Sequence, residues 1–272
     1  MEQLDFSLSI KDFVNTRKIK LFEYFEHKKC QLAIIQVGNN PASNTYINGK
    51  KKDAQEINVK IKHFKYDHIS EKAILKLIHK LNKNKKICGI IVQLPLPMNL
   101  NYDEIKEAIN PEKDVDGFGK SALVWPCTPY GIYLYLRSCK FDFNNKNVVV
   151  LGRSDIVGKP MARLLLANHA NVTILHSHTS ESNKKMFLSK ADLIIVATGR
   201  INTLTKEYTF KKNAVVIDVG INRDENNKLI GDCEKDLPVK FQSPVPGGVG
   251  LLTRLSIFEN LKTLIEYKDR KN

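Results

Sequence analysis

Four short runs of valine, isoleucine and leucine recur in the second half of the chain, with stretches of helix-compatible sequence between them. Each run has the length of a strand and is apolar at successive rather than alternate positions. Strands of this kind are buried on both faces, as in a parallel sheet covered by helices. The runs therefore predict a doubly wound parallel sheet, and they lie at 147–151, 171–175, 192–197 and 214–219.

The first half of the chain shows a similar alternation of strands and helices. Gln31–Gly38 and Ile87–Leu94 are short apolar runs that predict buried strands. After the first of them, Asn40 and Pro41 predict the start of a helix that can continue toward Glu56, because asparagine caps helices and proline is favoured in the first turn. With 272 residues, the chain is long enough for two domains with separate cores. We expect a two-domain α/β protein.

The cysteines and histidines do not predict a metal site. The five cysteines are scattered without C-x-x-C spacing, and the seven histidines form no H-E-x-x-H array. We expect no metal, and a reducing compartment such as the cytoplasm. No apolar stretch is long enough to cross a bilayer, so no membrane partner is expected.

A formal net charge of +14 would favour anionic ligands. The lysines are spread along polar helical stretches such as 72–86 and 206–212, which is typical of a solvated face. A basic stripe interleaved with aromatic residues is not present, so we expect no nucleic-acid partner. The alternative, a basic nucleic-acid-binding protein, predicts steeply salt-dependent binding to DNA or RNA.

One turn suggests a dinucleotide site. Gly152, Arg153 and Ser154 follow the strand at 147–151 and precede an apolar helix, whose first backbone amides can bind a pyrophosphate. The turn departs from the G-x-G-x-x-G pattern because Ser154 replaces the second glycine. On this motif alone, a purely structural turn is about equally compatible.

The end of the next strand favours NADP over NAD. NAD enzymes usually carry Asp or Glu there to bind the ribose hydroxyls, whereas this chain reads His176-Ser177-His178-Thr179. A 2′-phosphate would meet no carboxylate, and it would find the Arg153 cation and a hydroxyl donor. The alternative is that both histidines are solvated loop residues.

Four polar residues in the first half are candidates for catalysis. Tyr46 and Lys50 are four positions apart and share a helix face, where a lysine in an apolar site can act as a base. An exposed amphipathic pair has the same spacing. Gln93 ends a strand and needs a polar partner, and Asp116 can cap a turn or bind an amino-pyrimidine edge.

Seven segments of the chain carry a resemblance to a known family, and they lie at 37–50, 92–97, 111–117, 126–129, 152–160, 218–222 and 244–250. In this order they resemble the bifunctional methylenetetrahydrofolate dehydrogenase/methenyltetrahydrofolate cyclohydrolase family of the bacterial FolD type. The resemblance implies oxidation of 5,10-methylenetetrahydrofolate by NADP and hydrolysis of the 5,10-methenyl product to 10-formyltetrahydrofolate, in one-carbon metabolism.

The resemblance also implies a role for each candidate residue. Lys50 would be the central catalytic residue, Tyr46 would stack on the folate, Gln93 would hold Lys50, and Asp116 would bind the pterin. The residues expected to contact the phosphates of NADP are Gly152, Arg153, Ser154 and Ser177. Those expected beside its adenosine and nicotinamide portions are Thr198 and Ile221.

The family architecture predicts a discontinuous substrate domain and an inserted Rossmann-like dinucleotide-binding domain. Residues 1–121, completed by a C-terminal helix at 253–272, would form the folate-binding catalytic domain, and 122–252 would form the NADP-binding domain. Family members usually dimerise, so we expect a homodimer. The chain departs from the family at Gly250-Leu251-Leu252-Thr253, where Gly-Pro-Met-Thr is common, and at Asp232–Lys240. Leu251 frees a backbone dihedral that proline would restrict, so the balance of the two activities could differ.

Two other enzymes remain as alternatives. A dehydrogenase without cyclohydrolase activity could use Lys50 and Gln93 in the same way. A shikimate-type NADP dehydrogenase also has two α/β domains, but it would need a different Lys-Asp substrate pair and lacks the Pro-Gly-Gly-Val loop.

Overall fold

The computed structural model describes residues 4–271 of the chain. It divides into two compact units, which we name the 15–127 unit and the 128–253 unit after their longest segments. The first comprises Asn15–Cys127 and Arg254–Asn272, and the second comprises Met1–Val14 and Thr128–Thr253. Three helices contain boundaries between units, namely α1 (Ile10–Phe25), α5 (Cys127–Ser138) and α8 (Val249–Lys271).

The N-terminal segment groups with the 128–253 unit, whereas the sequence analysis placed it in the first domain. The ring of Phe6 stacks on that of Phe241 with 4.2 Å between centroids, and Tyr135 Oη donates to Leu8 O at 3.2 Å. These aromatic contacts join residues far apart in the sequence, and no local pattern indicates them.

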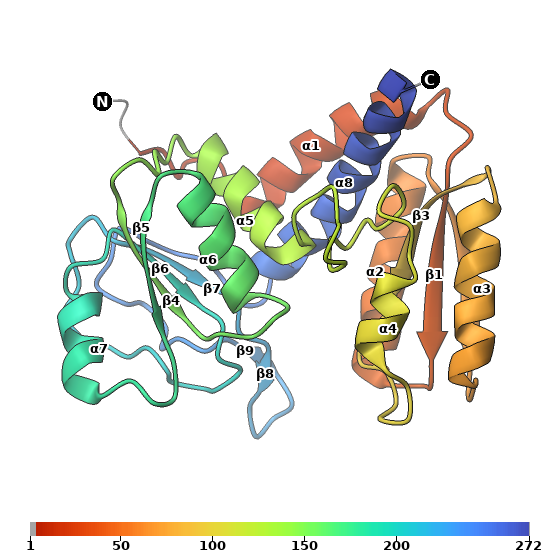
Figure 1. Ribbon diagram of the computed structural model, residues 1–272. Helices are drawn as coiled ribbons and strands as arrows, with labels where there is room; N and C mark the ends of the chain where they lie inside the picture. The colour runs from red at the N-terminus through yellow and green to blue at the C-terminus, as the bar shows by residue number, and fades with distance from the viewer. Residues whose placement is uncertain (1–3, 272) are drawn as a thin grey trace. The chain divides into compact units, whose positions relative to one another are not determined.

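The 15–127 unit contains a three-stranded parallel sheet in the order β2-β1-β3. Its strands are β1 (Gln31–Val37), β2 (Lys60–Tyr66) and β3 (Ile87–Val92). The helices between them are α2 (Pro41–Glu56) and α3 (Glu71–Lys83), which lie on opposite sides of the sheet in Figure 1, and α4 (Tyr102–Glu107) follows β3. The predicted start of α2 is confirmed: Asn40 caps it by accepting from Ser43 N at 3.1 Å, and Pro41 is its first residue.

Sequence analysis identified no strand at β2. Its sequence, KIKHFKY, has three exposed lysines and four half-buried residues, because β2 lies at the edge of the sheet. Edge strands often carry lysines, which discourage pairing with other chains. The same lysines hide the strand from a search for continuous apolar runs.

The 128–253 unit contains the predicted doubly wound sheet, which is confirmed as five parallel strands in the order β10-β7-β6-β4-β5. Its four predicted strands are β4 (Asn147–Leu151), β5 (Asn171–Leu175), β6 (Leu193–Val196) and β7 (Val215–Asp218). The helices are α5 (Cys127–Ser138), α6 (Gly158–Ala167) and α7 (Glu181–Leu188). Short strands that the sequence did not predict are β8 (Asn222–Arg223), β9 (Leu229–Ile230) and β10 (Phe241–Gln242).

Parallel pairing brings the carboxyl ends of the strands in each sheet to one edge. In the 15–127 unit, Gly38 and Gln93 follow β1 and β3 at that edge. In the 128–253 unit, the turns after β4, β5, β6 and β7 meet at the corresponding edge. Open α/β sheets bind their ligands there. Within residues 4–271, no helix is long and apolar enough to cross a membrane.

Candidate active site

Lys50 lies on α2 with its side chain almost fully enclosed, at 3% exposure. Its Nζ donates a hydrogen bond to Gln93 Oε1 at 3.0 Å, and the same nitrogen lies 5.2 Å from the centre of the Tyr46 ring. The predicted trio of Lys50, Tyr46 and Gln93 is therefore in contact within the 15–127 unit.

The orientation of Gln93 follows from its position directly after β3. Its backbone N–H donates to Ile35 O at 2.9 Å, and its Nε2 donates to Leu94 O at 2.8 Å. With the amide nitrogen occupied, Oε1 faces the ammonium or amine of Lys50. The amino-terminal end of α2 is tied to the same loop, because Ser43 Oγ donates to Leu94 O at 3.0 Å.

Asp116 is half-buried and influences Lys50 electrostatically. Burial lowers the pKa of Lys50, and the Asp116 carboxylate opposes part of that shift. Burial likewise raises the pKa of Asp116, with Lys50 opposing. A lysine with a lowered pKa exists as the neutral amine at lower pH than a solvated one, which is what a general base requires.

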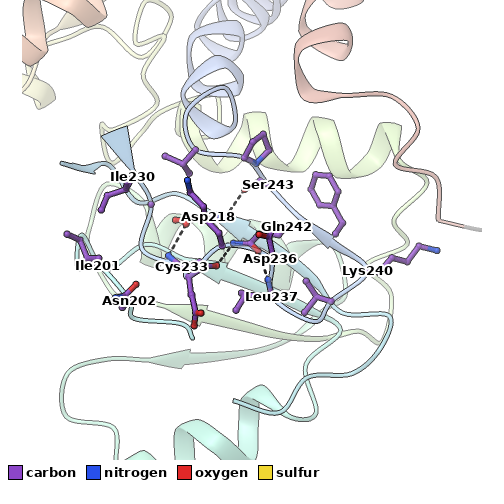
Figure 2. Close-up of a pocket in the computed structure, with 17 residues that line it drawn as sticks. Ile201, Asn202, Asp218, Ile230, Cys233, Asp236, Leu237, Lys240, Gln242 and Ser243 are labelled. Atoms are coloured by element: carbon purple, nitrogen blue, oxygen red, sulfur yellow. Dashed lines mark hydrogen bonds between the residues drawn. The ribbon is translucent and has the colours of Figure 1, made fainter. Parts of the chain in front are cut away.

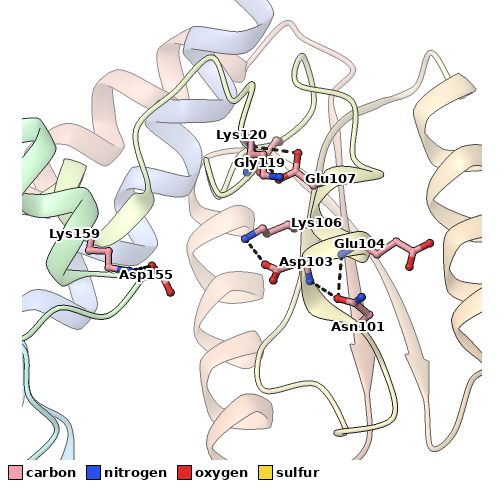
Figure 3. Close-up of polar contacts among 10 residues, drawn as sticks. Asn101, Asp103, Glu104, Lys106, Glu107, Gly119, Lys120, Asp155 and Lys159 are labelled. Atoms are coloured by element: carbon pink, nitrogen blue, oxygen red, sulfur yellow. Dashed lines mark hydrogen bonds and ion pairs between the residues drawn. The ribbon is translucent and has the colours of Figure 1, made fainter.

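The loop that carries Asp116 runs beside β3. Ile90 and Asp114 form a parallel bridge, so Asp116 lies level with the end of that strand. The Asp114 carboxylate accepts from Gly117 N at 3.0 Å and Gly119 N at 2.9 Å, and burial raises its pKa to about 6. Lys120 N donates to Glu107 at 3.0 Å, which closes the loop on α4 (Figure 3).

Sequence analysis did not single out Cys127 as a site residue, although it quoted the segment that contains it. Cys127 is buried, and its Sγ lies 3.2 Å from Val115 O and 3.8 Å from Asp116 Oδ1. Asn260 Nδ2 donates to Val115 O at 2.9 Å, and lies 3.6 Å from the same Sγ. These contacts brace the backbone before Asp116 against α8. No local pattern links Asn260 to this loop.

The turn after β4 has the backbone that a dinucleotide site requires. Gly152 has φ +113°, and a Cβ there would collide with Ala197 O at the end of β6. Only glycine allows two neighbouring strand ends to approach this closely. Gly158 packs in the same way on the carbonyl of Gly152. Both glycines therefore allow the turn to pack tightly between the ends of β4 and β6 and the start of α6.

The side chains of this turn divide into two groups. Ser154 Oγ accepts from Val157 N at 3.2 Å and Gly158 N at 3.3 Å, so it caps the start of α6. The side chain of Arg153 is exposed, as is Ser177 after β5. Exposed cations and hydroxyls at this edge suit the phosphates of NADP. Lys159 pairs with Asp155 at 2.7 Å within the same turn (Figure 3).

Thr198 and Ile221 follow β6 and β7 at the same edge. Ile221 is 66% exposed. The hydroxyl of Thr198 is engaged: it contacts Asp232 Oδ2 at 2.9 Å and Thr203 Oγ1 at 2.7 Å. The structure thus brings all six predicted cofactor residues to the ends of adjacent strands, but it gives Ser154 and Thr198 internal hydrogen bonds.

Asp232 is the organising residue that sequence reasoning missed. It is fully buried, and its Oδ2 accepts from Thr198 N at 2.7 Å and Gly199 N at 2.9 Å, while Oδ1 accepts from Asn222 Nδ2 at 2.8 Å. One carboxylate therefore shapes the loops after both β6 and β7. It lies in a segment that matched the family poorly, and it has no local signature.

A pocket of about 750 Å³ lies elsewhere in the 128–253 unit (Figure 2). Residues 230–245 form most of its wall, together with Ile201, Asn202 and Asp218. None of the six predicted cofactor residues lines it. Among the described residues, no cluster of His, Cys, Asp and Glu could hold a metal ion.

Both halves of the chain match models of one protein family. Residues 6–116 match the catalytic domain of tetrahydrofolate dehydrogenase/cyclohydrolase, and residues 126–269 match the NAD(P)-binding domain of the same enzyme. Together these two matches cover most of the chain.

Individual relatives extend this similarity. The bifunctional protein FolD of Agathobacter rectalis is 44% identical over 243 residues, which are 84% of this chain and 86% of that protein. The FolD dehydrogenase/cyclohydrolase structure from Campylobacter jejuni has a TM-score of 0.90 at 36% identity, covering 96% of this chain and 98% of that one. The structure of the Trypanosoma brucei enzyme, which was solved with NADP and an inhibitor, has a TM-score of 0.89 at 27% identity. This match covers 99% of this chain and 100% of that one. The chain therefore belongs to the tetrahydrofolate dehydrogenase/cyclohydrolase family.

Proposed function

We propose that the chain oxidises 5,10-methylenetetrahydrofolate with NADP and hydrolyses the 5,10-methenyl product to 10-formyltetrahydrofolate. The observation that carries this proposal is the enclosed Lys50 amine, 3.0 Å from Gln93 Oε1, in a segment that matches the family's catalytic domain. The two domain matches favour this function over the shikimate-type alternative.

Lys50 acts as the base in hydrolysis. The methenyl carbon lies between two nitrogens and carries amidinium character, so it accepts the oxygen of a water molecule. Lys50 takes one proton from that water as the new C–O bond forms, and this proton is returned to the nitrogen whose bond to the carbon then breaks. The second proton of the water leaves to solvent as the C=O bond of the formyl group forms. Gln93 holds the amine in place, and burial lowers the pKa of Lys50, which favours the neutral amine that a base requires.

Tyr46 and Asp116 bind the folate. The Tyr46 ring lies beside the Lys50 amine and offers an aromatic face to the substrate. The Asp116 carboxylate accepts hydrogen bonds from the amino group and ring nitrogen of the pterin. Binding energy at the pterin places the reacting carbon next to Lys50.

The turns of the 128–253 unit hold the cofactor. When bound, NADP accepts the hydride that oxidation removes from the bridging carbon. Arg153 binds the 2′-phosphate, and the residues that complete the site are Gly152, Ser154, Ser177, Thr198 and Ile221. In this assignment the 15–127 unit is the folate-binding catalytic domain and the 128–253 unit is the NADP-binding domain.

The cellular setting is also a proposal. We propose that the chain acts as a homodimer, because family members usually dimerise. We place it in the cytoplasm because its five cysteines are free thiols, which fits a reducing compartment. There its product, 10-formyltetrahydrofolate, would supply formyl groups for purine biosynthesis. Light scattering during gel filtration measures the dimer directly, as twice the 31.0 kDa chain mass.

One assay tests the catalytic proposal. The purified chain is mixed with 5,10-methylenetetrahydrofolate and either NADP or NAD, and the cofactor and methenyl absorbances are followed in one cuvette. We expect reduction of NADP in preference to NAD, and then enzyme-dependent decay of the methenyl form. Oxidation without that decay would leave a dehydrogenase alone, and no oxidation with either cofactor would refute the proposal.

A further inference from the structure

Two cysteines meet at the amino-terminal ends of β1 and β3. Cys30 directly precedes β1, and Cys88 is the second residue of β3. The pairing between these strands steps from Gln31↔Ile87 to Leu32↔Gly89, which leaves Cys88 as the extra residue of a bulge. Gln31, the residue after Cys30, pairs with Ile87, the residue before Cys88, so the two cysteines lie at the same end of neighbouring strands, and neither is in a disulfide.

The environments of the two thiols differ. Cys30 is buried at 3% exposure, whereas Cys88 is half-buried and accessible from solvent. The hydrogen bond from Cys30 lowers the pKa of Cys88, and the positive charges of Lys268 and Lys113 lower it further. The same contact and burial raise the pKa of Cys30. Cys88 is therefore both the more accessible and the more acidic of the two thiols.

The hydroxyl of Tyr24 adds an unused donor to this group. Tyr24 lies on α1, and burial raises the pKa of its hydroxyl to about 12, with the charges of Glu266 and Asp269 and, to a smaller extent, of both thiols adding to the shift. Its Oη is buried and has no hydrogen-bond partner among the described residues. Buried hydroxyls are usually satisfied, so this one indicates a place for an additional oxygen atom.

We propose that Cys30 and Cys88 form a thiol modification site, at which Cys88 reacts with a hydroperoxide and Cys30 then closes an intramolecular disulfide. Nothing in the folate reaction uses these residues, and the proposal does not depend on that function. Cys88 and Gln93 are five positions apart on an extended strand, or about 16 Å. The thiol pair thus lies at the opposite end of the sheet from Lys50.

Each step balances. The sulfur of Cys88 attacks one peroxide oxygen, the O–O bond breaks, and a sulfenic acid and one water or alcohol form. The Tyr24 hydroxyl donates to the sulfenic oxygen. The sulfur of Cys30 then attacks the sulfur of Cys88, the S–O bond breaks, and a second water carries away the oxygen. The pair loses two electrons, which reduce the peroxide.

The experiment is peroxide treatment of the folded full-length chain, followed by peptide mapping. With hydrogen peroxide we expect one disulfide, which joins the peptides of Cys30 and Cys88 within a single chain. Cys30→Ser should leave a sulfenic acid on Cys88 that dimedone captures, and Cys88→Ser should give neither product. Cys139→Ser, which removes a buried thiol elsewhere, should react as the parent does.

Two rate measurements complete the test. Alkylation of Cys88 by iodoacetamide should have a pH midpoint below the ordinary thiol value of 9.0, and this midpoint should rise in Cys30→Ser. Tyr24→Phe should slow formation of the disulfide by peroxide. The proposal is overturned if Cys88 reacts no faster than Cys127, Cys139 and Cys233 in the folded chain, or if the disulfides formed join separate chains.

Discussion

The charge of Lys50 determines what the catalytic site can do. A lysine enclosed by protein loses the solvation of its ammonium, and Gln93 accepts only one hydrogen bond from it. The pKa of Lys50 is therefore lowered, chiefly by burial. The Lys50 amine holds its proton more tightly in the unfolded chain than in the folded one. At pH values between the lowered pKa of the folded chain and the ordinary value of 10.5, the free energy of unfolding therefore rises with pH. Below that window, the buried lysine destabilises the fold.

Lys50→Met should separate catalysis from stability. We expect hydrolysis of the methenyl form to fall by about 10² to 10⁴, the usual contribution of a general base. The free energy of unfolding at pH 7 should stay equal or rise, because a desolvated cation has been removed. Lys52→Met, on the exposed side of the same helix, is the control and should keep full activity. Hydrolysis at the parental rate in Lys50→Met would disprove the assignment of the base.

Asp116 should give folate binding a characteristic pH dependence. Burial raises its pKa above the ordinary 3.8, and only the carboxylate accepts both pterin hydrogen bonds. The KM for the folate substrate should therefore increase as pH falls through this raised pKa. KM measured from pH 4 to 8 checks this. In Asp116→Asn the KM should be higher and should lose this pH dependence, and an unchanged profile would contradict the role.

Arg153 should discriminate between the two dinucleotides. A charge-assisted hydrogen bond to the 2′-phosphate is worth about 1.5–3 kcal/mol, so Arg153→Ala should raise the KM for NADP by about ten-fold or more. The KM for NAD should change little. Lys190→Ala, an exposed cation at the end of α7, is the matched control. Equal losses with both cofactors would remove the case for phosphate recognition.

At the scale of elements, the position of α2 depends on one buried carboxylate. Asp53 lies one helical turn beyond Lys50 and is 2% exposed. It pairs with Lys18 of α1, and its Oδ2 lies 2.7 Å from Arg254 Nε of α8. A Cβ at Gly49 would collide with the Arg254 guanidinium, so the backbone of α2 and this side chain are in close contact. Residues of three helices are thus tied together around Asp53, one turn from Lys50.

Asp53→Asn should destabilise the chain markedly. Removing the carboxylate of a buried ion pair leaves Arg254 without this ionic partner and typically costs about 3 kcal/mol. Chemical denaturation should therefore show a large drop in the free energy of unfolding. Glu56→Gln removes a carboxylate that pairs with the same Lys18 but is exposed, and it should cost less than about 1 kcal/mol. Similar losses in the two variants would show that burial of Asp53 is unimportant.

At the scale of the whole molecule, the net charge of +14 should affect the encounter with substrates. Folate and NADP are anions, and a cationic surface attracts them over a distance that salt shortens to about 8 Å at physiological ionic strength. We expect kcat/KM for the dehydrogenase reaction to fall several-fold when the salt concentration is raised from a low value to about 0.5 M NaCl, while kcat stays constant. A flat kcat/KM would mean that the lysines act only as a solvated surface.

Sequence analysis predicted the positions of single residues of the candidate site, but it did not predict which distant residues contact them. The position of Lys50 on a helix and the positions of Gln93 and Gly152 after strands follow from local apolar runs and from nearby helix-start and turn residues. The partners of these residues do not. Asp232 shapes the turns after two strands, and Asn260 braces the loop before Asp116, each through contacts distant in sequence.

The sequence by itself determined the α/β class, the parallel sheet of the second half and the start of α2. These depend on apolar periodicity, helix capping and turn residues, which are properties of neighbouring positions. Tertiary structure alone decided that β2 and β10 join their sheets, that residues 4–14 pack in the 128–253 unit, and that Cys30 meets Cys88. Such contacts are selected by burial against distant residues. Only the packed chain therefore reveals them.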